Sequence, residues 1–314
     1  MLTDQQFDRT RRLALRLTGI NLFERHRELL DRRSRRLGMS DPGNFEALLH
    51  TAEEGDQRAG RQLIGLLTTN FTGFFRHPWH FRIAAEHALR VAYRNGVPRL
   101  WSAAAATGEE PCSLAMALIE RFRCDDPPAS ILATDVDADA LEVARRGEYD
   151  ERAVRPANDG SRRHKEAQGL TTHQVRPPCA NDYEGQEMSG LSSERCAHFF
   201  VRTEVARLSV TPPVRQWVEF CEVNLAERSW PVEGPFDVIF CRNVLMYLET
   251  SRRHAVLERM ASLLAPEGLL IVDPTEHIGK AGQLFTSSAD GVYSCRRESG
   301  RAGPPTFQSQ GMNL

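Results

Sequence analysis

The sequence lacks the long apolar runs that a membrane-spanning helix needs. A helix of about 20 consecutive apolar residues is required to cross a bilayer, and the longest apolar runs here are much shorter. The segment MLTDQQFDRTRR at the N-terminus has no apolar core of the kind found in a secretory signal peptide. We therefore expect no insertion into a membrane and a location in the cytoplasm.

Several catalytic and metal-binding patterns are also absent. The chain has no G-x-S-x-G nucleophile elbow, no G-x-x-x-x-G-K-[ST] phosphate loop and no H-E-x-x-H zinc motif. Its seven cysteines are odd in number and include no C-x-x-C pair, so free thiols are expected. His77 and His80 are three residues apart, but no third ligand lies nearby, and no metal is predicted.

What is present is an ordinary globular composition with an uneven distribution of charge. Of 314 residues, 41% are hydrophobic and 26% are charged, which fits one large domain or a core with a small attached domain. The formal net charge is only −2, yet ten arginines lie between Arg9 and Arg36. The nearby acids that oppose them are Asp8, Glu24, Glu28 and Asp31. This basic segment indicates a partner with an acidic surface.

Hydrophobic periodicity predicts a helical N-terminal part followed by alternating strands and helices. Helices are expected near 7–17, 23–37, 42–49 and 63–67, and later near 111–122, 138–146 and 255–264. Strands are expected near 99–103, 130–134, 218–220, 236–241, 268–272 and 292–295. This alternation predicts an α/β fold with a parallel, doubly wound sheet. Two stretches do not fit this alternation. The polar stretch at 156–197 is interpreted as an insertion or mobile loop. The C-terminal tail at 299–314 is predicted to be disordered.

The loop after the first predicted strand has the composition of a ligand-binding turn. In open α/β sheets, ligands bind beyond the carboxyl ends of the strands. The alanines at 104–106 allow close approach to the backbone, and Gly108 allows a tight turn into the next helix. The loop differs from G-x-G-x-x-G and carries Glu109 and Glu110 where a pyrophosphate would lie. It therefore favours a cofactor with an ammonium or sulfonium group over a nicotinamide dinucleotide; a plain strand-to-helix turn is the alternative.

Two other strand ends carry side chains suited to a nucleoside. Asp135 ends the second strand, where an acid commonly accepts hydrogen bonds from ribose hydroxyls; a helix cap is the alternative. Asn224-Leu225 and Arg242-Asn243 follow later strands. Asparagine amides donate and accept, as an adenine edge requires, with ordinary loop hydrogen bonding as the alternative.

A polar segment outside the predicted sheet carries further candidates. Asn70, Thr72 and Arg76 are interleaved with phenylalanines. The guanidinium of Arg76 offers a fork of donors for a carboxylate, and a surface salt bridge is the alternative.

Five blocks, in this order, resemble the CheR-type chemotaxis receptor methyltransferases. They are LTTNFTGFFR (67–76), WSAAAATGEEPCSLAMAL (101–118), LATDVDADALEVARRGEY (132–149), VNLAERSWPVEGPFDVIFCRNVLMYL (223–248) and LLAPEGLL (263–270). Enzymes of this family use S-adenosylmethionine to esterify glutamates on chemoreceptors, and they leave S-adenosylhomocysteine.

The resemblance implies a Rossmann-like methyltransferase sheet with an all-helical domain before it. The implied parts are a basic, receptor-binding helical domain at 1–75, a cofactor-binding methyltransferase domain at 76–298 and the tail. A small β-subdomain is expected near 198–220, after the polar insertion. The arginines expected to contact the acidic helical bundle of a chemoreceptor are Arg25, Arg32, Arg33 and Arg36.

The resemblance also implies roles for individual residues. Tyr247 matches a tyrosine beside the transferring methyl group, and Arg76 is expected to direct a carboxylate of the substrate or the cofactor. Asp135 matches the ribose-binding acid, and Glu110 is preferred as the acceptor of the cofactor's amino group. The predicted cofactor contacts are Asn70, Thr72, Arg76, Gly108, Glu109, Glu110, Asp135, Asn224, Leu225, Arg242 and Asn243.

The chain departs from the family pattern in three places. Asp273-Pro274-Thr275-Glu276 stands where Gly-His-Ser-Glu is frequent, and Cys112 stands where a tyrosine is usual. The glycine-bearing turn of the β-subdomain is missing, so binding of a receptor tether peptide is not predicted.

Other functions stay open beside receptor methylation. One is a methyltransferase of the same fold that acts on another protein or on a small molecule. Another is a non-catalytic module that binds the cofactor or a receptor-like partner, which the intact Arg76, Asp135 and Tyr247 disfavour. Nucleic-acid binding by the arginine-rich helices is disfavoured because the sequence has no recognisable DNA- or RNA-binding motif.

Overall fold

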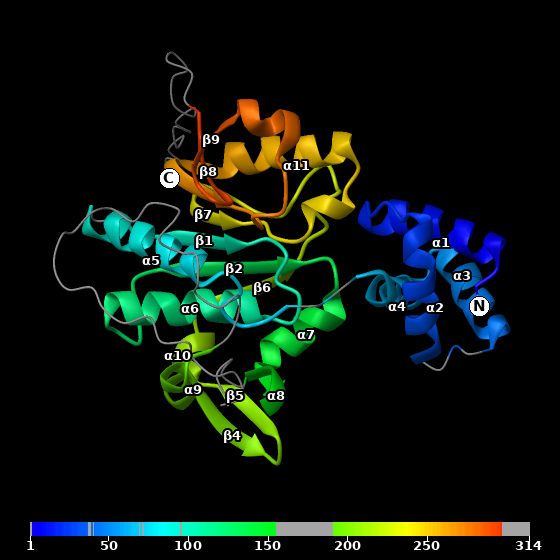
Figure 1. The fold of residues 1–314 in the computed structure, drawn as a ribbon, viewed down its shortest axis with the longest axis horizontal. Coiled ribbons are helices and arrows are strands. Elements are labelled where there is room, and N and C mark those ends of the chain that lie inside the picture. Colours follow the sequence, from blue (N-terminus) through cyan, green and yellow to red (C-terminus); the bar gives the residue numbers. More distant parts are fainter. Residues whose placement is uncertain are drawn as a thin grey trace, which may run out of the picture.

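The computed structural model describes residues 2–154 and 191–296, except for positions 37, 38, 40, 69, 71 and 95. Within these residues the chain forms a helical region, a seven-stranded sheet with helices, and a three-stranded sheet (Figure 1). Most of the predicted insertion and all of the predicted tail lie outside the described residues. Among the described helices, none has the length and apolar character needed to cross a membrane.

The N-terminal helices have clear start signals and a core of their own. They are α1 (Asp4–Thr18), the 3-10 turn η1 (Glu24–His26), α2 (Arg27–Arg36), α3 (Pro42–Glu53) and α4 (Gln57–Leu67). Thr3 forms a capping box at the start of α1, and Asp41 caps α3 ahead of a proline in its first turn. Phe7, Leu49 and Leu63 are fully buried together. These helices therefore pack around an apolar centre separate from that of the sheet.

The large sheet has the strand order β6-β2-β1-β7-β8-β10-β9. Its strands are β1 (Arg99–Ser102), β2 (Ser130–Asp135), β6 (Val218–Glu222), β7 (Phe236–Phe240), β8 (Leu264–Ile271), β9 (Phe285–Ala289) and β10 (Val292–Cys295). The pairs among β6, β2, β1, β7 and β8 are parallel, which confirms the α/β prediction. The pairs of β10 with β8 and β9 are antiparallel, so the sheet is mixed and the predicted parallel arrangement does not extend to this edge.

Helices bury both faces of this sheet. Phe81 on α5 (Pro78–Tyr93) and Leu114 on α6 (Glu109–Phe122) belong to one core, and Met260 on α11 (Thr250–Leu263) belongs to another. The neighbours Leu100 and Trp101 on β1 join opposite cores, as the two-residue period of a strand requires. With both faces covered, the carboxyl ends of the parallel strands form the open edge at which a ligand can bind.

The small sheet has the order β3-β5-β4 and is antiparallel. Its strands are β3 (Glu148–Asp150), β4 (Phe200–Glu204) and β5 (Arg207–Val210), with the short helices α8 (Glu151–Val154), α9 (Ser193–Phe199) and α10 (Pro212–Arg215). Residues 218–220 were expected in the β-subdomain but belong to β6, because Val218 pairs with Ile131 of the large sheet. In the turn between β4 and β5, Ala206 has φ +59°, a conformation that favours glycine.

A short seam of backbone contacts joins the helical region to the large sheet. Ile20 and Leu248 form an antiparallel β-bridge, and Asn21 N donates to Tyr247 O at 2.9 Å. Asn224 Nδ2 donates to Leu17 O at 2.7 Å, at the carbonyl end of α1. The seam is defined here as residues 17–21 together with Asn224, Tyr247 and Leu248.

Gly19 provides a test of how closely the seam is packed. It has φ +70°, and an added Cβ would lie 2.3 Å from Ala226 Cβ. Gly19→Ala is expected to lower the free energy of unfolding by roughly 1–3 kcal/mol, through backbone strain and overpacking. Urea unfolding measures the loss. Gly55→Ala is the control, because Gly55 has φ +91° but nothing within 4 Å of its added Cβ. An equal loss in both variants would contradict the packing contribution.

Candidate active site

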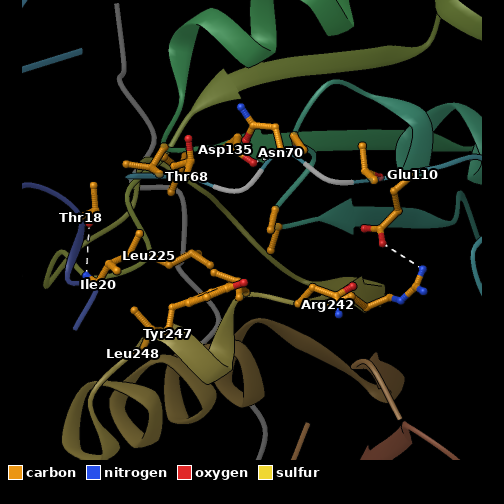
Figure 2. A pocket seen from close by; sticks show the side chains of 18 of the residues that line it. Thr18, Ile20, Thr68, Asn70, Glu110, Asp135, Leu225, Arg242, Tyr247 and Leu248 are labelled. Carbon is orange, nitrogen blue, oxygen red and sulfur yellow. Dashed lines mark hydrogen bonds and ion pairs between the residues drawn. The ribbon is translucent and has the colours of Figure 1, made fainter. Parts of the chain in front are cut away.

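A pocket lies at the carboxyl ends of β1, β2, β6 and β7. Ten of the twelve residues predicted for catalysis or cofactor binding line it: Asn70, Thr72, Arg76, Glu110, Asp135, Asn224, Leu225, Arg242, Asn243 and Tyr247. Figure 2 shows Asp135 and Asn70 across the pocket from Tyr247 and Leu248. Side chains from distant segments therefore converge where the fold leaves an open edge.

Two predicted cofactor contacts, Gly108 and Glu109, are not among the lining residues. Gly108 has φ +96°, and a Cβ there would lie 2.7 Å from Ala144 Cβ on α7 (Ala138–Arg146), so packing requires glycine. Glu109 is buried and accepts a hydrogen bond from Thr107 Oγ1 at 2.7 Å. Successive helical residues point about 100° apart, so of the two acids only Glu110 faces the pocket. The contacts predicted from Gly108 and Glu109 to the cofactor stay predictions, and the packing and hydrogen bond of these residues give each a structural role.

Asp135 ends β2 with its carboxylate held by backbone donors. Oδ2 accepts from Ala106 N at 2.8 Å, and Oδ1 accepts from Asp137 N at 2.9 Å. Burial raises the pKa of Asp135 to about 6, although these hydrogen bonds oppose the rise. Each oxygen retains acceptor capacity, so the group can still receive the hydroxyls of a ribose.

A buried ion pair joins three segments around the pocket. Arg242 Nη1 lies 3.1 Å from Glu110 Oε2, and Ser102 Oγ donates to Glu110 Oε1 at 2.8 Å (Figure 2 draws the ion pair). Arg242 Nη2 donates to Arg76 O at 2.7 Å. Burial raises the pKa of Glu110 and lowers the pKa of Arg242, and the opposite charge of the partner counteracts each shift. The pair fixes the end of β7 against the start of α6 and the segment before α5.

The loop after β8 places a carboxylate behind Arg76. Asp273 Oδ2 lies 3.8 Å from Arg76 Nη2 and 3.4 Å from His77 Nε2. Asp273 Oδ1 accepts from Thr275 N at 3.0 Å and from Thr275 Oγ1 at 2.6 Å. Burial would raise the pKa of Asp273, but the hydrogen bonds from Thr275 and Asn243 outweigh it and lower the pKa to about 2. A stable negative charge therefore faces the Arg76 guanidinium.

Glu276, in the same loop, holds the segment that carries Tyr247. Its Oε2 accepts from Asn243 N at 2.8 Å, and its Oε1 accepts from Met246 N at 3.2 Å. The sequence marks 273–276 only as a departure from a family pattern. In the structure this loop supports both residues that were predicted to be catalytic.

Two asparagines that were predicted to contact the cofactor use their amides within the protein. Asn70 Nδ2 donates to Asp137 Oδ2 at 2.9 Å, next to Thr68 Oγ1, which donates to the same oxygen at 2.7 Å. Asn224 Nδ2 donates to Leu17 O in the seam, and its Oδ1 accepts a backbone N–H. Both side chains line the pocket, but their main hydrogen bonds shape its wall.

The helical region supplies lining residues that sequence reasoning missed. Thr18 and Ile20 line the pocket beside Leu248. Both residues lie between the helices predicted near 7–17 and 23–37, and the residues that they meet lie far along the chain. No local pattern could have identified these two residues as part of the site.

The four arginines predicted to bind a partner differ in their surroundings. Arg25 and Arg32 are exposed. Arg33 Nη1 donates to two carbonyls at the C-terminal end of α4, at 2.9 and 2.7 Å. These bonds tie α2 to α4, and the partner contact of Arg33 stays a prediction. The side chain of Arg36 lies outside the described residues.

His80 is a core histidine in this structure. It is fully buried, and Nε2 donates to Asp290 O at 2.9 Å. Burial lowers its pKa to about 3, so the ring is neutral. Across the part of the chain that is described, no three His, Cys, Asp or Glu side chains form a group that could hold a metal ion.

The pocket has the donor and acceptor groups that S-adenosylmethionine requires. Ala103, Ala104 and Ala106 leave room beside the backbone, and apolar Leu225 and Val136 offer a wall for a purine. A carboxylate has about four acceptor positions, and Glu110 uses two of them, so it can still accept from an ammonium group.

Comparison with known proteins decides the family. The CheR methyltransferase, SAM binding domain, matches residues 70–181 and 176–293. The chain belongs to the CheR methyltransferase family. The enzyme is 35% identical to chemotaxis protein methyltransferase 2 of Pseudomonas aeruginosa over 298 residues, 93% of each chain. It is 33% identical to the chemotaxis protein methyltransferase of Escherichia coli over 306 residues, 95% of this chain and 93% of that one.

The family confirms the resemblance inferred from the sequence, the methyltransferase activity and S-adenosylmethionine as the cofactor. The enzyme is also 32% identical to the chemotaxis protein methyltransferase of Salmonella typhimurium over 304 residues, 95% of this chain and 92% of that one. The matched domain begins at Asn70. Thr18 and Ile20 therefore reach the cofactor pocket from outside the matched domain.

Asp273→Asn tests whether the loop after β8 orients Arg76. The change removes the charge that faces the guanidinium but keeps the volume of the side chain. We expect S-adenosylmethionine to bind roughly 5–30-fold more weakly, which corresponds to about 1–2 kcal/mol. Isothermal titration calorimetry measures the affinity, with Glu86→Gln as a control in which an exposed pair with Arg121 is lost. Equal affinities for Asp273→Asn and the unaltered enzyme would show that Asp273 does not orient the site.

Proposed function

We propose that the enzyme transfers the methyl group of S-adenosylmethionine to glutamate side chains on the cytoplasmic helices of chemoreceptors, and that it acts in the cytoplasm. The names of the relatives, chemotaxis protein methyltransferase, support this proposal. The observation that carries it is that the helical region forms one wall of the cofactor pocket, next to Tyr247. A protein bound to the helical region can thus reach the site of methyl transfer.

The chemistry needs no strong base. S-adenosylmethionine supplies a methyl group on a sulfonium, and transfer to a carboxylate gives a neutral methyl ester and S-adenosylhomocysteine. A glutamate side chain has a pKa of about 4.3 and is ionised at pH 7. The chain therefore contributes mainly orientation of the acceptor and exclusion of water.

Arg76 is placed to direct a carboxylate. Its side chain is 34% exposed at the pocket, with Asp273 behind the guanidinium. Its backbone carbonyl is fixed by Arg242. A guanidinium has five N–H donors, so it can bind a carboxylate of the acceptor or of the cofactor while it still faces Asp273.

Tyr247 is assigned to the path of the methyl group. Its carbonyl is held by the seam, and the N–H of the preceding residue is held by Glu276. Figure 2 shows its ring between Leu225 and Leu248, with the hydroxyl directed into the pocket. A rigid aromatic wall at this place would keep water away from the acceptor oxygen.

We assign residues 1–75 to receptor binding and 76–298 to methyl transfer. Arg25 and Arg32 are exposed on the helical region and match the charge of an acidic receptor bundle. Each ester removes one negative charge from that bundle, which weakens the repulsion between its helices. This loss of charge gives a physical route from methylation to a change in receptor state.

The proposal is tested with methyl-labelled S-adenosylmethionine and a chemoreceptor cytoplasmic fragment. We expect label on the fragment that mild base releases as methanol, as from a carboxyl ester. Arg76→Ala should lower the rate at saturating cofactor and receptor roughly 10–100-fold, because the carboxylate loses its orientation. Arg121→Ala, on the surface, is the control.

Other outcomes would overturn the proposal in distinguishable ways. Cofactor binding without label on the fragment would favour another methyl acceptor. Loss of both label and cofactor binding would favour a non-catalytic module. An unchanged rate for Arg76→Ala would remove Arg76 from the mechanism but leave the reaction standing.

Asp135 gives a test of ribose recognition by pH. Its pKa is raised to about 6, so the group is a carboxylate above that pH and neutral below it. Hydroxyls bind the carboxylate better, so affinity for S-adenosylmethionine should be constant above about pH 7 and should fall toward tenfold per pH unit below about pH 5. Asp135→Asn should bind more weakly at pH 8 and lose this dependence. The same pH profile in both proteins would contradict the assignment.

A further inference from the structure

Two exposed apolar side chains of the described structure line one groove. Phe23 and Met246 are each 43% exposed. They belong to segments far apart in the sequence, the loop before η1 and the 3-10 turn η3 (Leu245–Tyr247). Tyr247, Leu248 and Glu249 line the groove beside them.

The apolar pair is held in place by the backbone beneath it. Phe23 N donates to His26 Nδ1 at 2.9 Å, and Met246 N donates to Glu276 Oε1 at 3.2 Å. The Arg25 guanidinium lies over the Phe23 ring, 4.7 Å from its centroid. Because each side chain is 43% exposed, a partner that covers the pair would bury apolar surface that now faces water. Exposed apolar side chains that share one groove form a contact surface for such a partner.

The groove adjoins the cofactor pocket. Tyr247 and Leu248 line both. Leu248 also forms the β-bridge with Ile20, which lines the cofactor pocket. A partner seated in the groove therefore lies directly at the side of the pocket where Tyr247 stands.

We infer that Phe23 and Met246 dock apolar side chains of the acceptor helix, beside the glutamate that receives the methyl group. This inference rests on the proposed function and adds the surface that selects the acceptor. The positive charge of Arg25, next to Phe23, favours acidic residues of a partner there. The negative charge of Glu249, which lines the groove, disfavours acidic residues beside it. An amphipathic helix with an apolar stripe beside its glutamates fits both the apolar pair and this distribution of charge.

A helix face is favoured over an extended peptide because the backbone groups at the seam are already in use. Asn21 N already donates to the carbonyl of Tyr247. The groove therefore offers side chains rather than a strand edge at this point, and helix docking relies on side-chain anchors.

The test compares variants on initial rates with the chemoreceptor cytoplasmic fragment and labelled S-adenosylmethionine. Phe23→Ala and Met246→Ala should each raise KM for the fragment about tenfold, the usual effect of truncating an apolar anchor. The kcat and the affinity for S-adenosylmethionine should stay within twofold. Phe23→Leu should recover most of the loss, and Phe23→Glu should exceed it.

Matched controls are exposed apolar residues elsewhere on the surface. Tyr93 is 79% exposed and Val97 is 64% exposed. Tyr93→Ala and Val97→Ala should leave KM for the fragment unchanged. Thermal melting of each variant shows that the fold is retained.

The outcomes separate this inference from the proposed function. Base-labile label with the unaltered enzyme, but an unchanged KM in Phe23→Ala and Met246→Ala, would overturn the inference alone. A parallel loss of affinity for S-adenosylmethionine would show that the two residues support the pocket rather than dock a partner. A shift from dimer to monomer in sedimentation of Phe23→Ala would assign the groove to a second copy of the chain. Absence of label with the unaltered enzyme would overturn both.

Discussion

The structure depends on the seam between the helical region and the large sheet. Three backbone contacts make up the seam: Asn21 N donates to Tyr247 O, the β-bridge of Ile20 and Leu248 lies next to it, and Asn224 Nδ2 donates to Leu17 O. Together they hold two separately packed cores in one fixed relation. Each such bond contributes only about 1 kcal/mol. Their importance is positional, since they bring the turn after α1 into the wall of the cofactor pocket. The region proposed to recognise the acceptor and the residue assigned to the methyl path thus share a backbone contact.

Buried charged groups position side chains and backbone on the other side of the pocket. The Glu110–Arg242 pair and the Asp273 carboxylate stand in an interior where an unpaired charge would be costly. Both groups position Arg76: Arg242 donates a hydrogen bond to its backbone carbonyl, and Asp273 faces its guanidinium. Asp273-Pro274-Thr275 stands where the family pattern frequently has Gly-His-Ser. Glu276, which this chain shares with the pattern, still accepts a hydrogen bond from Met246 N, next to Tyr247.

Local patterns carried the fold and most of the site, because strand ends, caps and helix starts are local features. The alternation of strands and helices predicted the α/β sheet, and Asp135 and Arg242 were found from their places after strands. Contacts between distant segments were not predictable in this way. The amide of Asn70 binds Asp137, and Arg33 binds the end of α4, because tertiary packing brought these groups together. The strand β9 was missed because its FTSSA sequence is mostly polar and exposed at the sheet edge. Of the adjacent acids Glu109 and Glu110, the family resemblance favoured Glu110, and Glu110 is the one that lines the pocket.

The central claim is that methyl transfer to protein glutamates takes place at the seam. It is tested most directly by mass spectrometric peptide mapping of a chemoreceptor cytoplasmic fragment after incubation with the enzyme and S-adenosylmethionine. We expect methyl groups on glutamate side chains of the receptor helices, in sequences where an apolar stripe lies next to the modified residue. Methyl groups on lysine, arginine or main-chain termini, or glutamates modified without regard to their neighbours, would contradict the claim.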